Sequence, residues 1–556
     1  MKSRNANDRP SPLMTSRKSC RLWLSLMLAF LCASCAGGQG RSPCPNGEKC
    51  LEVGNTAEPF TLDPSRANLV TESTILYDMM VGLTTYDGKG RTVPGMAVAW
   101  TTSQDGLTWT FTLRKANWSD GVPVTATDFV TAFRRIQDPA TASPYSYLYY
   151  LIVGTEAVNA GKARPETIGA FAPSPQTLVL KLTHPAPYLA QLLAHSSALP
   201  LPRHVIARWG DKWVEPAHYV TNGAYTLQFW KLGDRIVLRK NPQFVDVHSV
   251  CFDQVSYYPT TDPVSAERRV ASGELDMINY SVQSRAKYRS QHMPGYDRPN
   301  PILSTYYVAF NLQVPQLTDR RVRLALSMAI DREFMASKLL GAGVTPLYGF
   351  TPPGLPGYEQ IATPIWAAWP FERRIAAAQE LMRRVGYTAD HPLTLEFKYA
   401  TSGGRSGIAA LQADWRRIGA DISLAPAELQ IHYSELNVKA YQIALAGWTA
   451  DYADASTYLD LFLKSSGQQN YTGYDNPAYA GLAAQATQER DGQKRISILR
   501  RSEALAMADW PVAPLYTDSS SYLVNPRITG FTPNAADWHL KRYMCERPRQ
   551  PASPTS

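Results

Sequence analysis

Residues 97–138 read "AVAWTTSQDGLTWTFTLRKANWSDGVPVTATDFVTAFRRIQD" and contain a clear strand pattern. Trp109, Phe111 and Leu113 alternate with threonines. This period of two is typical of a strand that buries one face and exposes the other. The stretch therefore predicts a half-buried strand over 108–114.

Two further regions carry strand signals. The run "TLVLKL" (177–182) has the same alternation. Residues 223–242 read as two strands joined at Leu232-Gly233-Asp234, which predicts a β-hairpin because a short Gly-containing turn between alternating segments is the usual hairpin signal.

Helical periodicity dominates the later part of the chain. Residues 320–341 and 373–387 each carry an apolar stripe at helical spacing, and each ends on a glycine that can stop a helix. The stripes consist of Val322, Leu326, Ala329 and Ile330 in the first segment and of Ile375, Ala378, Leu381, Met382 and Val385 in the second. Strands and helices alternate without an obvious repeat, so the sequence predicts a mixed α/β protein.

The composition limits the class of protein and the partners to be expected. The 556 residues are 44% hydrophobic and 19% charged, which is ordinary globular composition with room for two or three domains. Tyrosine (30) and tryptophan (13) together outnumber phenylalanine (16), and rings with a polar atom suit binding clefts. The net charge is +9. Residues 1–34 hold six basic residues and one acidic residue, so the remainder carries 9 − 5 = +4, which predicts no nucleic-acid partner.

The N-terminus has the features of a secretory leader. Basic residues (Arg17, Lys18 and Arg21) precede the apolar run "LWLSLMLAFL". This run is too short to span a bilayer as a permanent helix and fits the apolar region of a signal peptide.

The run is followed by "LCASCAGG", which resembles the lipobox of bacterial lipoproteins. In that motif the cysteine, here Cys35, is diacylated and becomes the mature N-terminus; Cys32 stands where the motif prefers leucine. We expect residues 1–34 to be the signal peptide, residues 35–44 a tether, and the protein to be periplasmic and lipid-anchored to a bacterial membrane. Met14 offers an alternative start. The C-x-x-C spacing could also indicate a redox pair, but such pairs open a helix after a strand.

Four cysteines remain beyond the leader: Cys44, Cys50, Cys251 and Cys545. In an oxidising periplasm they could pair in three ways, and the sequence alone does not choose among them. The spacing makes a Cys44–Cys50 bridge sterically easy, with Cys251–Cys545 as the remaining pair. Zinc is the competing interpretation, although no histidine lies near them in the sequence.

Motifs for catalysis are missing from the sequence. It contains no H-E-x-x-H, G-x-S-x-G, G-x-x-x-x-G-K-[ST] or G-x-G-x-x-G. Its nine histidines are scattered, without a close pair suited to a metal. His195 lies in the apolar stretch "LLAHSSALPLP", which favours a structural role, although it is kept as a ligand-site candidate. We therefore expect no enzymatic activity, no metal and no cofactor.

One acidic residue raises a sharper question. In "AGWTADYADAST" (446–457), Asp451 follows an apolar run that reads as a buried strand. A partly buried carboxylate there needs a partner, because an unpaired charge is costly to desolvate. It could cap the following turn or helix, or it could be a fixed anion that awaits a cationic ligand. The nearby pair of Asp451 and Asp454 is more typical of solvated or capping residues than of catalysis.

Several segments of the chain resemble one protein family. Besides 97–138, the segments "TLDPSRANLVTES", "DPATASPYSYL", "VTNGAYTL", "DRRVRLALSMAIDR" and "AGWTADY" resemble the bacterial extracellular solute-binding proteins that serve peptide and nickel ABC importers, and within them the oligopeptide-binding members. The matching segments run in order from about residue 52 to 545, nearly the whole mature chain.

The resemblance implies a periplasmic-binding-protein fold of type II, with two lobes, an extra inserted domain and the ligand in the cleft between the lobes. The implied boundaries are domain I over 45–78, 203–303 and 520–545, domain II over 79–202, domain III over 304–519, and a tail over 546–556.

The same resemblance implies a function. A peptide would lie extended between the lobes, hydrogen-bonded through its backbone, with its side chains in roomy hydrated pockets. Lobe closure would present the loaded protein, a monomer, to the ABC permease and its ATPase subunits. A murein peptide, haem or another ligand on the same fold is the alternative, and a cell-envelope enzyme is the rival from another class.

Specific residues are implied as the site. Asp451 matches the family's aspartate that pairs with the α-amino group of the peptide. Trp448 and Tyr145 match aromatic positions that line the site, although packing between domains is an alternative for both. Asn68 and Val70 match a loop whose backbone reaches the ligand.

The chain also departs from the family pattern. Ser304 and Thr449 replace the two cysteines of an enterobacterial disulfide, and Leu445 and Leu340 replace cations that reach the carboxylate of the peptide. Leu429 falls where an aromatic residue is expected. Arg405 lies near a further position where the family carries a cation, and it could supply the missing charge. The resemblance therefore implies a kept N-terminal anchor and an altered C-terminal one, so that longer peptides or cell-wall peptides become plausible ligands.

Overall fold

The computed structural model describes residues 44–279, 286–341, 343–355, 357–358, 363–401 and 405–547. The expected signal peptide, Cys35 and most of the tether lie outside these ranges. Within them, no helix has the length and apolar character needed to cross a membrane.

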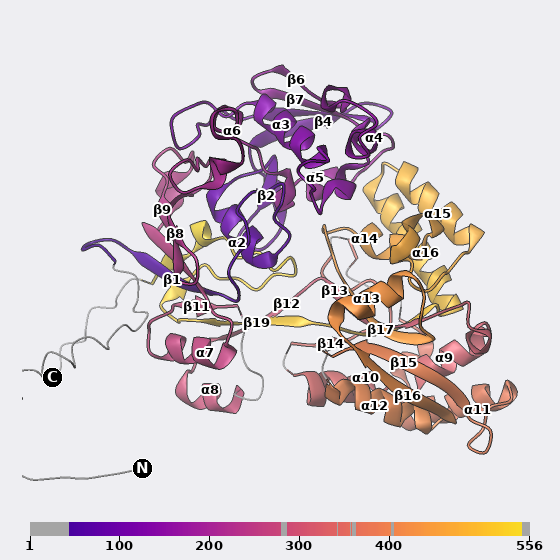
Figure 1. Ribbon diagram of the computed structural model, residues 1–556. Coiled ribbons are helices and arrows are strands. Elements are labelled where there is room, and N and C mark those ends of the chain that lie inside the picture. The colour runs from indigo at the N-terminus through magenta and orange to yellow at the C-terminus, as the bar shows by residue number, and fades with distance from the viewer. Residues whose placement is uncertain are drawn as a thin grey trace, which may run out of the picture. The chain divides into compact units, whose positions relative to one another are not determined.

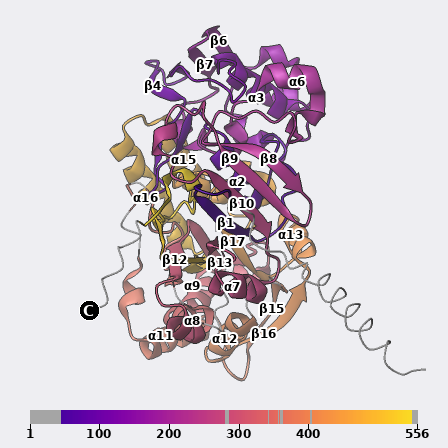
Figure 2. The ribbon, with the colours of Figure 1, turned by 90° about the vertical axis from the view of Figure 1, so that its left-hand side faces the viewer.

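A seven-stranded mixed sheet collects segments from three distant parts of the chain. Its order is β12-β19-β11-β1-β10-β9-β8, and Figure 2 shows β1 beside β10, with which it pairs in parallel. The strands are β1 (Cys50–Asn55), β8 (Tyr225–Lys231), β9 (Arg235–Lys240), β10 (Gln254–Pro259), β11 (Met277–Ile278), β12 (Asp297–Pro301) and β19 (Ser519–Val524). Strands β8 and β9 are antiparallel neighbours, which confirms the predicted hairpin.

A four-stranded antiparallel sheet holds the stretch that opened the sequence analysis. It has the order β4-β5-β7-β6 and consists of β4 (Ala97–Thr102), β5 (Thr108–Leu113), β6 (Ala170–Ser174) and β7 (Thr177–Lys181). Trp109, Phe111 and Leu113 are buried, so the strands predicted there and at 177–182 are confirmed. Helix α3 (Ala126–Gln137) lies against this sheet (Figure 1).

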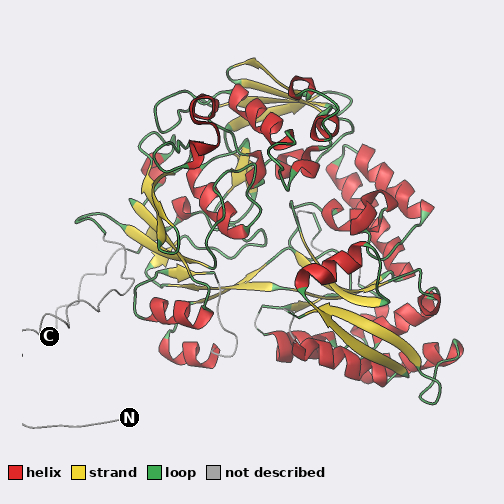
Figure 3. Ribbon diagram, viewed as in Figure 1, coloured by secondary structure: helices red, strands yellow, loops and turns green. Residues whose placement is uncertain are grey.

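A six-stranded sheet contains the strand that precedes Asp451. Its order is β14-β18-β13-β17-β15-β16, and Figure 3 shows helices along it. The strands are β13 (Ser304–Phe310), β14 (Thr345–Pro346), β15 (Leu393–Ala400), β16 (Ala420–Ala427), β17 (Ile443–Thr449) and β18 (Val512–Thr517). The longer helices of this part are α9 (Arg320–Met328), α11 (Phe371–Arg384), α12 (Arg405–Arg416), α15 (Pro477–Gln488) and α16 (Gly492–Asp509).

Further α-helices and strands lie in the described chain. The helices are α2 (Val70–Met79), α4 (Thr155–Asn159), α5 (Leu189–Leu192), α6 (Arg203–Trp209), α7 (Pro263–Ala271), α8 (Ala286–His292), α10 (Arg332–Phe334), α13 (Leu429–Asn437) and α14 (Ser456–Leu459). The strands are β2 (Thr84–Tyr86) paired with β3 (Thr92–Pro94), and β20 (Ile528–Thr529) paired with β21 (Cys545–Glu546).

The apolar side chains form two large cores. One core runs from the seven-stranded sheet into the four-stranded sheet, and the other surrounds the six-stranded sheet. The three sheets draw their strands from the segments assigned to domains I, II and III respectively, with β19 starting one residue early. The domain boundaries themselves stay predictions.

The helix predicted over 320–341 is wrong as a single element. Helix α9 ends at Met328, and the chain restarts as α10 and a π-helical turn over Met335–Leu340. Asp331 forms the break: its carboxylate accepts the N–H of Phe334 (3.1 Å) and its own N–H donates to Asp414 (2.9 Å). A side chain that caps a new helix competes with continuation of the old one. Helix α11, by contrast, confirms its prediction, and Gly386 follows it with φ of +91°.

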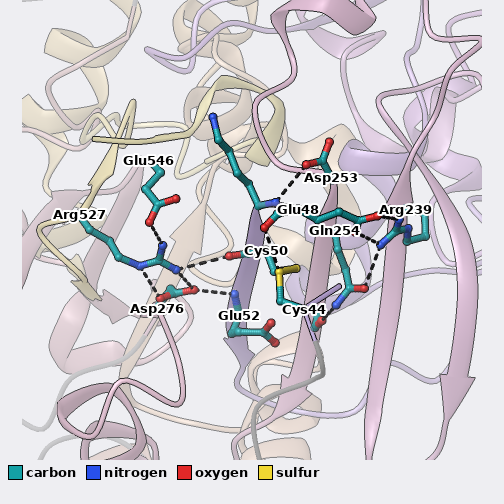
Figure 4. The surroundings of a disulfide bond; sticks show 12 residues. Cys44, Glu48, Cys50, Glu52, Arg239, Asp253, Gln254, Asp276, Arg527 and Glu546 are labelled. Atoms are coloured by element: carbon teal, nitrogen blue, oxygen red, sulfur yellow. Dashed lines mark hydrogen bonds and ion pairs between the residues drawn. A yellow bond between two sulfur atoms is a disulfide. The ribbon is translucent and has the colours of Figure 1, made fainter. Parts of the chain in front are cut away.

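Two disulfides join Cys44 to Cys50 and Cys251 to Cys545, with Cα atoms 5.8 and 5.2 Å apart. This is one of the three pairings left open, and it excludes zinc at these sulfurs. Figure 4 shows charged groups around the first bridge. Arg527 forms ion pairs with Asp276 (2.7 Å) and Glu546 (2.5 Å), so ionic contacts and a bridge both tie the last strand to the seven-stranded sheet.

Candidate functional site

A cavity of about 390 Å³ brings five of the predicted residues together. We call it the ligand cavity. Asn68, Val70, Tyr145, His195 and Asp451 all line it, although they are far apart in the sequence. The end of β17 and the loop after it supply Thr449–Ala453, and the C-terminal segment supplies Ala535–Trp538.

Asp451 presents a carboxylate to this cavity. Burial raises the pKa of Asp451 to about 6, and a hydrogen bond from the Tyr147 hydroxyl (3.4 Å) partly opposes that effect. Among the residues that the structure describes, no lysine, arginine or histidine forms an ion pair with it. The carboxylate is therefore an anion at neutral pH whose counter-charge is not supplied by the described part of the chain.

Asp454, three residues later, has the role that the capping interpretation offered to Asp451. Its carboxylate accepts the N–H (3.0 Å) and the hydroxyl (2.7 Å) of Ser456, the first residue of α14. It also accepts two hydrogen bonds from the Arg495 guanidinium, at 2.6 and 2.9 Å. Asp454 is thus satisfied within the fold, whereas Asp451 is not.

Tyr145 is held by His195. The two rings meet edge to face with centroids 4.5 Å apart. His195 Nδ1 lies 2.7 Å from the Ser197 hydroxyl and accepts the N–H of Ser197. Burial lowers the pKa of His195 to about 4, so the ring is neutral at physiological pH. His195 reaches the cavity wall as a neutral support for Tyr145, in line with the structural role favoured from its sequence context.

The loop carrying Asn68 and Val70 is organised by Glu72, a residue that the sequence analysis missed. Glu72 is fully buried near the start of α2. One carboxylate oxygen accepts the N–H groups of Asn68 (2.7 Å) and Leu69 (2.9 Å), and the other accepts those of Phe60 and Thr61. A glutamate three residues into a helix often bonds back to the preceding N–H, so the spacing "LVTE" is a signal that could have identified it.

Trp448 lines a second cavity of about 460 Å³, which we call the side cavity. Its indole N–H donates to the Thr457 hydroxyl (3.2 Å). Asp451 and Tyr452 lie on the walls of both cavities. Trp448 was predicted to line the peptide site. It borders the side cavity instead, and this cavity meets the ligand cavity at Asp451.

The residues predicted around the carboxyl end of a peptide are less well defined. Arg405 begins α12, and its side chain lies outside what the structure describes. Leu340 and Leu445 are half-buried against the second core, and Leu429 at the start of α13 is 45% exposed. A carboxylate anchor at Arg405 stays a prediction. Ser304 and Thr449 lie directly opposite each other on β13 and β17, as a replaced disulfide pair would.

A metal ion needs several His, Cys, Asp or Glu side chains close together. In the described ranges, no three or more His, Cys, Asp or Glu side chains are grouped to hold an ion. Two carboxylates line the ligand cavity, and that of Asp537 accepts hydrogen bonds from Asn300, Ser520 and Tyr522. The chemistry left for a ligand is therefore the Asp451 carboxylate, neutral aromatic rings, and the backbone at 68–70 and 449–453.

Comparison with known proteins gives consistent matches. The family model described as bacterial extracellular solute-binding proteins, family 5, middle part, matches residues 91–470. The periplasmic oligopeptide-binding protein OppA of Escherichia coli (strain K12) is 36% identical over 491 residues, 87% of this chain and 90% of that protein.

Solved structures agree with these matches. The periplasmic murein tripeptide binding protein MppA in its unliganded open form matches with a TM-score of 0.82 and 31% identity, covering 92% of this chain and 99% of that one. Haemophilus influenzae OppA in complex with the peptide RPPGFSPFR matches with a TM-score of 0.72 and 30% identity, covering 90% and 99%. The fold is therefore the mixed α/β fold of the periplasmic binding proteins.

Proposed function

The chain belongs to the bacterial extracellular solute-binding proteins of family 5, and on that premise we propose that it captures oligopeptides and delivers them to the permease and ATPase subunits of an ABC importer. The observation that carries the proposal is the Asp451 carboxylate, which faces the ligand cavity without an ion-pair partner among the described residues. The α-ammonium of a peptide is the cation that this carboxylate would hold.

The physical argument rests on desolvation. A carboxylate whose pKa is raised by burial gains more from a hydrogen-bonded cation than an exposed one does, because the surrounding medium screens the pair less. The neighbouring Tyr147 hydroxyl would stay as one donor, and the peptide ammonium would supply the others.

The rest of the cavity suits a ligand recognised through its backbone. The loop at Asn68–Val70 is fixed by Glu72, so its remaining backbone groups can meet an extended peptide. The Tyr145 ring gives apolar surface without charge. Backbone pairing with roomy side-chain space gives affinity with little demand on sequence.

A murein peptide is the favoured alternative ligand, because one matching structure is a murein tripeptide binding protein. Haem or another non-standard ligand on the same fold is a further alternative. An enzyme of the cell envelope is the rival class, and we propose a transport role without catalysis, since family 5 proteins are transport binding proteins.

Mass spectrometry of the ligand that co-purifies with the protein tests these readings together. Protein from its native host would be denatured and the released small molecules identified. Unmodified oligopeptides with free amino termini are the expected result. Release of haem or a sugar-linked murein fragment without a free α-amine would contradict the proposal, as would cleavage of peptides added to the native protein.

We also propose a periplasmic location with a lipid anchor at Cys35 and a monomeric state. The relatives are named as periplasmic proteins, and the lipobox-like "LCASC" supports the anchor. Cys35→Ala should move the protein from the membrane fraction to the soluble fraction, and size-exclusion chromatography of that variant should give one chain per particle. Equal membrane retention of the wild type and the variant would contradict a lipid anchor at Cys35.

A further inference from the structure

The side cavity continues the ligand cavity past Asp451. Asp451 and Tyr452 form a wall common to both. A ligand whose α-ammonium lies at Asp451 therefore has the mouth of the side cavity within reach of its nearest side chains. The volume of about 460 Å³ falls in the range of pockets that bind small organic groups.

The walls of the side cavity are acidic. Asp451 and Asp460 line it, and among the described residues of its wall none is a lysine or an arginine. His184 also lines it, but burial lowers its pKa, so the ring is neutral at neutral pH. The pKa values of Tyr147 and Tyr188 are raised, again chiefly by burial. The cavity wall is therefore negatively charged at neutral pH; the charge comes mainly from Asp451 and in part from Asp460, whose carboxyl is only partly ionised near pH 7.

The backbone of Asp460 is hydrogen-bonded, whereas its carboxylate has no such partner among the described residues. The backbone carbonyl of Asp460 accepts the Ser466 hydroxyl (2.5 Å) and the N–H of Leu463 (2.9 Å). Its carboxylate, however, receives no hydrogen bond and forms no ion pair within the described ranges. Burial raises the pKa of Asp460 to about 7, the charge of Asp454 adds to this effect, and Arg495 opposes it. Arg495 itself is already paired with Asp454.

The uncharged part of the wall suits a flexible apolar stem. Leu148, Leu151 and Leu192 line the cavity. The rings of Tyr188 and Tyr452 stack at 5.0 Å, and both border it. Methylene groups pack on such surfaces while a cationic head reaches a polar end, and ring faces attract cations.

From this geometry we propose that the side cavity receives a basic side chain of the bound peptide, with Asp460 as the counter-ion of its ammonium or guanidinium group. The inference rests on the proposed function, because it takes the α-ammonium to be held at Asp451. It adds a selectivity for peptides that carry lysine or arginine near their amino terminus.

The test uses calorimetry with a set of tetrapeptides. Tetra-alanine is compared with peptides that carry one lysine, or one norleucine, at each of the first three positions. Norleucine keeps the stem and removes the charge. Wild-type protein should bind one lysine peptide about tenfold more tightly than its norleucine counterpart, which corresponds to about 1.4 kcal/mol.

Asp460→Asn should reduce that lysine-to-norleucine ratio to about one. Asp421→Asn is the matched control, because Asp421 is an exposed aspartate on β16, and it should keep the wild-type ratio. The ratio is a sharper measure than affinity itself, since a general loss of folding would lower both affinities together.

Each other outcome overturns the assignment. Equal binding of lysine and norleucine peptides by the wild type, or an unchanged ratio in Asp460→Asn, removes Asp460 as the counter-ion while leaving peptide binding intact. Saturable binding of putrescine alone would assign the cavity to free diamines instead. If the wild type binds none of the peptides, the proposed function fails, and the Asp460 assignment fails with it.

Discussion

Asp451 and Asp454 lie three residues apart on the loop after β17, yet the fold treats them in opposite ways. Asp454 receives two hydrogen bonds from Arg495 and two from Ser456. Asp451 receives one long hydrogen bond from Tyr147 and lies on the wall of two cavities. A carboxylate in this loop is therefore structural where the chain supplies a cation for it, as at Asp454. It is available to a ligand where the described chain supplies no cation, as at Asp451.

Removing the Asp451 carboxylate should have the largest effect, and it should appear in binding. Asp451→Asn leaves the α-ammonium of a peptide without its counter-charge, which costs on the order of 3–5 kcal/mol for a buried pair. Affinity for a free peptide should fall by about two to four powers of ten, as measured by calorimetry. The same substitution at Asp454 should change peptide affinity far less, provided the variant is folded.

An N-acetylated peptide completes this comparison. Acetylation removes the ammonium, so it should weaken wild-type binding by a similar factor and weaken Asp451→Asn much less, because the pair is already lost. If acetylation is equally costly in both proteins, Asp451 does not hold the amino terminus.

Removing the Asp454 carboxylate should instead lower stability. The Arg495 side chain is 6% exposed, so Asp454→Asn leaves a buried guanidinium without a counter-charge. The free energy of unfolding should fall by about 2–4 kcal/mol, measured by urea denaturation. A second variant, Asp454→Asn with Arg495→Met, removes both charges and should recover part of the loss. A double variant less stable than the single one would show that Arg495 stabilises the protein by other contacts.

Much of the fold follows from the periodicity of the sequence. Alternation at 108–114 and the Gly-containing turn at 232–234 predicted β5 and the β8–β9 hairpin, because these signals are local. The break in the helix predicted over 320–341 was missed, because it depends on Asp331 bonding to Asp414, more than eighty residues away. Family resemblance implied that domain I is assembled from three separate segments, whereas the order of the strands in the large sheet was not predicted, since no local pattern specifies it.

The candidate site divides in the same way. Asp451 and Tyr145 were placed by resemblance, and the structure brings them to one cavity. Glu72 holds N–H groups from residues up to twelve positions away, and Asp460 is notable for the partner that its carboxylate lacks in the described fold. The bond from Glu72 to Leu69 has a sequence signal in "LVTE", but the bonds of Glu72 to Phe60 and Thr61 and the missing partner of Asp460 have none, because they depend on what the folded chain places around a carboxylate.

Binding should depend on pH through Asp451. Its pKa is raised to about 6 in the free protein, and pairing with an ammonium requires the ionised form. Affinity for tetra-alanine should thus be highest near pH 7 and fall roughly tenfold per pH unit below 6, where the α-amine stays protonated, and it should decline again above about pH 8 as the α-amine deprotonates. The tyrosines that face Asp451 do not titrate in this range, because the pKa values of Tyr145, Tyr147 and Tyr458 are raised. Asp460, on the wall of the side cavity, does titrate near pH 7. The N-acetylated peptide should lack the dependence, and a parallel fall for both peptides would assign the titration elsewhere.

The smallest expected effect is a gain in stability when the charge of Asp451 is removed from the ligand-free protein. Because the folded-state pKa (about 6) lies above the unfolded value of 3.8, the native state prefers the protonated carboxyl. The stabilisation that the protonated Asp451 carboxyl gives to the folded state is complete below about pH 3.8 and is lost as the pH rises through 6.

At pH 7.5, Asp451→Asn should therefore be more stable than the wild type by about 1–2 kcal/mol, allowing for the partial exposure of the carboxylate. The difference should shrink toward zero at pH 4. Both proteins would first be unfolded and refolded to remove bound peptide, since a ligand that favours the wild type would reverse the order. Thermal unfolding at the two pH values gives the measurement, with Asp454→Asn as the matched variant that loses stability at pH 7.5. If Asp451→Asn is destabilised at pH 7.5 as Asp454→Asn is, the Asp451 carboxylate supports the fold in the way Asp454 does, and the contrast between the two residues disappears.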